Sequence, residues 1–111
     1  MITVLPLVPA KFAENVQTTQ YQAPTGTRAI VDKATVVNTT SGAVSFSINV
    51  VPASGSVSDA NLVLDARAIS PFETYTLPEL VGHVLEPGGY ISTLASAPNA
   101  LAFRVSGRQV T

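Results

Sequence analysis

The stretch that most constrains the fold is Ala43–Val51, which reads A-V-S-F-S-I-N-V-V. Its side chains alternate between apolar Val44, Phe46, Ile48 and Val50 and polar Ser45, Ser47 and Asn49. A period of two residues indicates a strand with one buried and one solvated face, because successive side chains of a strand point to opposite sides. We therefore expect an antiparallel sheet with a core on one side.

Further strands are expected on both sides of this one. They are Thr18–Ala23, Arg28–Asn38, Asn61–Ile69, Phe72–Leu77, Tyr90–Ser96 and Ala100–Ser106. The alternation in Arg28–Asn38 breaks at Asp32 and Lys33, which predicts a β-bulge. The alternation in Asn61–Ile69 predicts one face made of Leu62, Leu64, Ala66 and Ala68 and an opposite face made of Val63, Asp65, Arg67 and Ile69.

Glycine, proline and asparagine mark the connections between these strands. Turns are expected at Pro24–Gly26, Asn38–Gly42, Glu86–Gly89 and Ala97–Asn99, and a mobile polar loop at Pro52–Ala60. Thr76 and Glu79 are spaced as in a capping box, with Pro78 in the first turn. This spacing predicts one helical turn over Leu77–Val81, ended by Gly82.

Residues 1–17 lack a clean period and contain Pro6 and Pro9, which exclude a helix interior or a central strand. We expect an extended N-terminal arm. It either packs on its own domain as an edge strand or adds a strand to a neighbouring subunit. Residues 18–111 are expected to form a single domain, because a chain of 111 residues has one core to bury.

The expected fold class is therefore all-β, an antiparallel β-sandwich. About eight short strands without room for helical crossovers favour a jelly roll, with an immunoglobulin-like sandwich as the alternative.

The surface of such a domain is unusually poor in charge. Charged residues make up 12% of the chain, against about 25% in typical globular domains, and the net charge is −1. Either serine, threonine, asparagine and glutamine solvate this surface, or partner subunits cover much of it. The chain contains no cysteine, so neither disulfides nor thiolate metal sites are available.

The sequence does not favour nucleic acid or a membrane as a partner. Nucleic acid binding requires clustered positive charge, whereas the six basic residues are dispersed as Lys11, Arg28, Lys33, Arg67, Arg104 and Arg108. The apolar start, Met1–Pro9, lacks the basic residues and cleavage pattern of a signal peptide. No stretch approaches the ~20 apolar residues of a membrane-spanning helix.

No catalytic, cofactor-binding or metal-binding residue is expected. His83 is the only histidine, and none of the serines lies in a nucleophile elbow. The H-V-L-E run from His83 to Glu86 lacks a second ligand at zinc spacing. The acidic residues are isolated in sequence, and Asp59 beside Asn61 falls short of a cation cage. The chain is therefore not expected to be an enzyme.

Two weaker possibilities concern binding. Arg104 and Arg108 flank a short V-S-G segment and could form a small anion site, although ordinary surface arginines are the favoured interpretation. Without tryptophan, only Tyr21, Tyr75 and Tyr90 could stack against a sugar.

Two segments resemble small structural proteins of tailed bacteriophages. They are A-T-V-V-N-T-T-S-G-A-V-S-F-S-I-N-V-V-P over residues 34–52 and F-E-T-Y-T-L-P-E-L-V-G-H-V-L-E-P-G-G-Y-I-S-T-L-A-S over residues 72–96. The resembling pattern is an N-T-T/S hairpin and an alternating strand, followed later by an L-x-E-L-x-G-x-V-L-x-P-G segment. It covers about two-thirds of the chain and consists of strand and turn residues.

The resemblance implies a virion component that is assembled in the host cytoplasm. The expected role is a head decoration or cement protein on the capsid surface, a homotrimer whose partner is the major capsid protein. A tail, connector or fibre module and a carbohydrate-binding sandwich are the alternatives.

Overall fold

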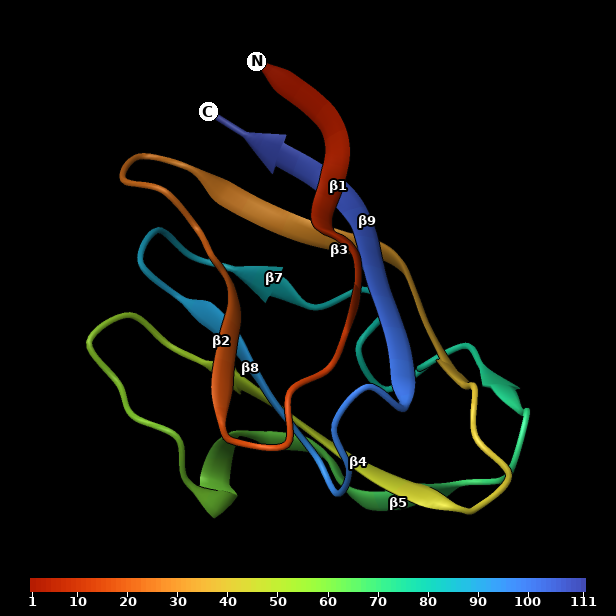
Figure 1. The fold of residues 1–111 in the computed structure, drawn as a ribbon. Coiled ribbons are helices and arrows are strands. Elements are labelled where there is room, and N and C mark those ends of the chain that lie inside the picture. Colours follow the sequence, from red (N-terminus) through yellow and green to blue (C-terminus); the bar gives the residue numbers. More distant parts are fainter.

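The structure, a computed structural model, describes all of residues 1–111 and consists mainly of β-strands (Figure 1). In chain order the strands are β1 (Ile2–Phe12), β2 (Thr18–Gln22), β3 (Arg28–Asn38), β4 (Val44–Val51), β5 (Leu62–Ile69), β6 (Thr74–Tyr75), β7 (Val84–Leu85), β8 (Tyr90–Ala95) and β9 (Leu101–Val110). A single 3-10 turn, η1 (Asp59–Asn61), precedes β5. The chain forms no helix that is long and apolar enough to cross a membrane.

The strands form two antiparallel sheets. The first sheet has the order β1-β9-β3-β6, and β7 pairs with β3 as well. The second sheet has the order β2-β8-β4-β5. The two sheets pack face to face, which confirms the expected all-β sandwich.

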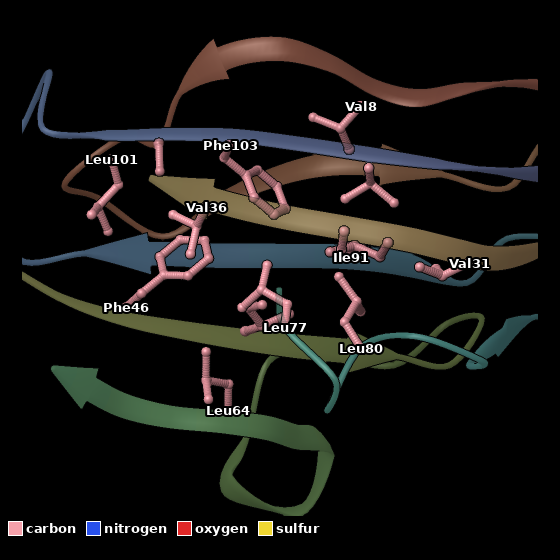
Figure 2. Close-up of a cluster of buried hydrophobic side chains, with 14 of the residues drawn as sticks. Val8, Val31, Val36, Phe46, Leu64, Leu77, Leu80, Ile91, Leu101 and Phe103 are labelled. Carbon is pink, nitrogen blue, oxygen red and sulfur yellow. The ribbon is translucent and has the colours of Figure 1, made fainter. Parts of the chain in front are cut away.

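The core lies between the sheets and receives side chains from both. Phe46 of β4 and Phe103 of β9 meet edge to face at its centre, with ring centroids 5.3 Å apart (Figure 2). Leu77 and Leu80, from the connection between β6 and β7, are fully buried beside them. Aromatic pairs in this geometry stabilise a core beyond their burial alone.

The alternation that predicted β4 holds over most of the strand. Val44, Phe46 and Ile48 are buried as expected. The end of the strand differs, because Asn49 and Val51 are buried whereas Val50 is only half-buried. The pairing of β4 with β5 is irregular between Ile48 and Asn49.

The expected bulge in β3 is confirmed. Val31 pairs with Gly107 of β9 and Lys33 with Ser106, so Asp32 is an extra residue in β3. The inward alternation therefore resumes at Ala34 and Val36 after the bulge, and the strand buries apolar side chains along its whole length.

The predicted faces of β5 are wrong in their second half. Leu64 and Ile69 are both buried, whereas Ala66 and Ala68 are exposed. Leu64 pairs with Ile48 of β4 and Arg67 pairs with Phe46, so β5 has one more residue than β4 between these two pairs. This extra residue bends the strand at Ala66, which has a φ of 46°, and thereby reverses the side-chain alternation.

The predicted helical turn over Leu77–Val81 is also wrong. Leu77 has a φ of 49°, which lies outside the helical region. The segment is instead a turn in which the Leu80 N–H donates to the Leu77 carbonyl at 3.0 Å. Glu79 does not cap it, because its carboxylate accepts a hydrogen bond from the Tyr75 hydroxyl at 2.7 Å.

The N-terminal segment is an edge strand of its own domain, the first of the two expected alternatives. β1 pairs with β9 from Ile2 opposite Val110 to Phe12 opposite Ala102. Leu7 and Val8 point into the core. The pairing is irregular between Pro6 and Val8 and again up to Lys11, in the part of the strand that contains both prolines.

Candidate functional site

His83 lies on the surface, at the edge of a hollow of about 530 Å³. The other lining residues are Val50, Pro52, Ser58, Ala60, Asn61, Leu62 and Val63. The backbone carbonyl of His83 accepts a hydrogen bond from the Val31 N–H at 3.1 Å. No carboxylate lines the hollow, so it does not place an acid or base beside the imidazole.

The loop beside this hollow is held by amide side chains. The buried Asn49 amide donates to the Asn61 Oδ1 atom at 2.7 Å and to the Ser58 carbonyl at 3.0 Å. The Asn61 amide in turn donates to the Ser56 carbonyl at 2.9 Å. These bonds explain why Asn49 is buried rather than on the expected solvated face.

The acidic residues that form contacts bind cations, uncharged side chains or backbone groups rather than each other. Three ion pairs are present: Glu14 with Lys11 at 2.8 Å, Arg28 with Glu86 at 2.7 Å and Arg108 with Asp32 at 3.0 Å. No group of three or more histidine, aspartate or glutamate side chains converges on a point where a metal could bind. Asp59, the one carboxylate considered for a cation, is exposed in η1.

Glu14 and Tyr75 have shifted pKa values. Hydrogen bonds from Lys11 and then from Gln20 hold the pKa of the Glu14 carboxyl below its usual value. Burial raises the pKa of the Tyr75 phenol, and its hydrogen bond to Glu79 acts in the same direction. The Glu14 shift thus follows from side-chain contacts, and the Tyr75 shift follows first from burial.

The three tyrosines do not form a shared stacking surface. Tyr21 packs against the core and accepts a hydrogen bond from Gln109 at 2.6 Å. The Tyr75 ring lies under the Arg67 guanidinium at 4.0 Å. Tyr90 donates to the Gly55 carbonyl at 3.2 Å. This geometry does not favour carbohydrate binding through the three tyrosine rings, which stays an untested prediction.

The structure does not bring Arg104 and Arg108 together as an anion site. Arg108 donates to both carboxylate oxygens of Asp32. Arg104 instead lies with Lys33, Thr35 and Ser106 around a polar hollow of about 280 Å³. No local sequence signal predicts this group, because Lys33 and Arg104 belong to strands far apart in sequence and only the register of β3 with β9 places them together.

Several strongly exposed apolar side chains lie along β1, the outer strand of the first sheet (Figure 1). Ile2 is 61% exposed, Val4 is 77% exposed and Phe12 is 46% exposed. Ile2 and Val4 pair with Val110 and Arg108 of β9, so they share the outer face of the sheet with those residues. An apolar edge strand of this kind is a surface to which another chain can bind.

Comparisons of this chain with protein-family models, with curated proteins and with solved structures find no match.

Proposed function

We propose that this chain is a structural virion protein that binds the outer surface of a bacteriophage capsid as a head decoration protein. The observation that carries the proposal is the exposed apolar strand β1 at the open edge of a charge-poor sandwich. Such a strand is costly to leave in water, whereas a partner subunit that covers it gains apolar burial and backbone hydrogen bonds. We propose no enzymatic activity, cofactor or nucleic acid partner.

We infer further that the sandwich is a jelly roll. In support, β1 pairs with β9, β2 with β8, β3 with both β6 and β7, and β4 with β5. If β6 and β7 count as one interrupted strand, the chain has eight strands in two sheets. The pairs then nest inside one another, as in a long hairpin that is folded over. Jelly rolls of this kind occur in viral capsid domains, which supports a virion role.

The proposed mechanism is repeated weak binding. A homotrimer presents three copies of the β1 edge to neighbouring copies of the major capsid protein. Simultaneous contacts raise the overall affinity well above that of one contact, because the second and third contacts form within a bound complex. The capsid is stabilised because the bound trimer connects adjacent capsid subunits.

Light scattering combined with co-sedimentation tests this function. The purified protein is expected to be trimeric and to sediment with shells of its cognate capsid protein. Val4→Lys places a charge on the β1 edge and is expected to remove co-sedimentation without unfolding the domain, because Val4 is 77% exposed. Val57→Lys is the matched control at an exposed valine in the loop before η1 and is expected to bind normally.

A monomer that fails to bind shells contradicts the proposal. Recovery of the protein in a tail fraction at a few copies per virion would instead assign it to a tail, connector or fibre module.

A further inference from the structure

The outer face of the first sheet carries a second feature, which is independent of the β1 edge. It is the polar hollow lined by Lys33 and Thr35 of β3 and by Arg104 and Ser106 of β9. These two strands lie inside the sheet, where β9 pairs with β1 and β3 pairs with β6 and β7. On the side away from β9, β3 pairs with β7 at Ala29 and Ile30 and with β6 at Val36 and Val37, so Lys33 and Thr35 lie between these two contacts.

The register of the two strands arranges the four side chains as a square. Lys33 is opposite Ser106, and Thr35 is opposite Arg104. All four point outward, because the residues between them, Ala34 and Val105, are buried in the core. Opposite side chains start about 5 Å apart and diagonal ones about 7–8 Å apart. The two cations thus occupy one diagonal and the two hydroxyls the other.

The four polar groups have no partner within the protein. Neither Lys33 nor Arg104 takes part in an ion pair, and none of the four side chains forms an internal hydrogen bond. Asp32, the carboxylate next to Lys33 in sequence, is already bound by Arg108 through both of its oxygens. No acidic residue lines the hollow. Two positive charges and two hydroxyls therefore face solvent uncompensated.

We propose that this hollow binds a single phosphate group, as inorganic phosphate or as a phosphate monoester. A phosphate monoester carries a charge of about −1.5 to −2 at neutral pH and three acceptor oxygens. That charge matches the two cations, and the oxygens match donors from arginine, lysine and the two hydroxyls. A carboxylate supplies one charge and two oxygens, so it leaves part of the square unpaired.

Nuclear magnetic resonance titration of the full chain tests this site, with ionic strength held constant by sodium chloride. The probes are inorganic phosphate, O-phosphoserine and acetate. We expect saturable shifts of the backbone amides of Lys33, Thr35, Arg104 and Ser106, and binding of acetate weaker by about tenfold. Phosphoserine is expected to bind more tightly as the pH rises through about 6, where the ester takes its second charge.

Two variants remove the cations singly. Lys33→Gln and Arg104→Gln are each expected to weaken phosphate binding by about tenfold. Arg67→Gln is the matched control, because it removes the same charge from an exposed arginine of β5 on the other sheet. It is expected to change the affinity by less than about twofold.

The outcomes separate the source of the ligand from the existence of the site. Saturation by inorganic phosphate alone assigns the site to the free ion, and saturation by phosphoserine alone assigns it to an ester. The proposal is overturned if neither probe saturates, if acetate binds as well as phosphate, or if Arg67→Gln weakens binding as much as Arg104→Gln does. None of these readouts depends on capsid binding.

Discussion

Gly107 of β9 pairs with Val31 of β3, next to the bulge. A Cβ atom at this position would collide with the Ile30 carbonyl oxygen and would approach the Leu7 Cδ1 atom to 2.8 Å. The residue is buried, so neither neighbour can move into solvent. Glycine is therefore required here by close approach of two chain segments.

We predict that Gly107→Ala lowers the free energy of unfolding by about 3 kcal/mol, because overpacking forces the backbone of β3 to shift. Gly42→Ala is the control, since nothing lies within 4 Å of a Cβ atom there. It is expected to change stability by less than about 1 kcal/mol. Urea denaturation of both variants measures the difference. If Gly107→Ala is as stable as Gly42→Ala, the backbone of β3 can shift at the bulge without loss of stability.

Glu14 provides a residue-scale prediction that depends on pH. Because its pKa is lowered in the folded state, its contribution to stability is present above the usual value of 4.5 and is lost as the pH falls through the lower folded-state value. Glu14→Gln is expected to cost about 0.5 kcal/mol at neutral pH, since the ion pair with Lys11 is partly exposed.

The cost of Glu14→Gln is expected to be smaller at an acidic pH below the lowered folded-state pKa than at neutral pH, because the native carboxyl is also protonated there. Denaturation curves of the two proteins at both pH values provide the measurement. A cost that stays constant with pH would show that the contribution of Glu14 is steric rather than electrostatic.

At the scale of elements, Asn38 joins the end of β3 to the loop before β4 and to the end of β5. Its buried amide donates to the carbonyls of Gly42 at 2.8 Å and Ile69 at 3.0 Å. Its oxygen accepts from the N–H of Thr40 at 2.9 Å. One side chain thus binds three polar backbone groups, two in the loop before β4 and one at the end of β5.

We predict that Asn38→Ala costs about 3 kcal/mol, because it removes three hydrogen bonds between a buried amide and backbone groups. Asn99→Gly is the control, since Asn99 is an exposed turn residue with a φ of 52° that glycine adopts easily. It is expected to change stability by less than about 0.5 kcal/mol. Thermal or urea unfolding distinguishes the two variants, and a small effect of Asn38→Ala would imply that water replaces the amide.

At the scale of the whole molecule, the first and last strands are neighbours. The Thr111 N–H donates to the Met1 carbonyl at 2.9 Å, and the two ends lie side by side (Figure 1). The chain must therefore close its longest loop before β1 can pair with β9. Such long-range pairing slows folding.

A circular permutant tests this arrangement. Joining Thr111 to Met1 through a hairpin loop of about three to five residues makes β9 and β1 neighbours in sequence. The new ends are placed between the exposed Asn15 and Val16. We expect the permutant to unfold cooperatively and to refold faster than the natural order of strands, as measured by stopped-flow fluorescence of its tyrosines. Loss of cooperative unfolding would mean that the β1–β2 connection is needed intact.

Much of the sandwich could be predicted from local signals. The alternation in β4 and β9, the bulge at Asp32 and the turn at Gly26 follow from side-chain period and backbone freedom, which neighbouring residues in the sequence already express. These features depend on a few adjacent residues, so the sequence by itself determined them.

Only the tertiary structure decided which distant groups meet. The reversal of faces in β5 depends on its register with β4, and Asn49 is buried because a loop supplies partners for its amide. The polar hollow required Lys33 and Arg104 to lie on paired strands, whereas the sequence favoured ordinary surface arginines and offered Arg104 with Arg108 only as a weaker alternative. Register and pairing are set by the packing of the whole core, and that information is not contained in any one stretch of the chain.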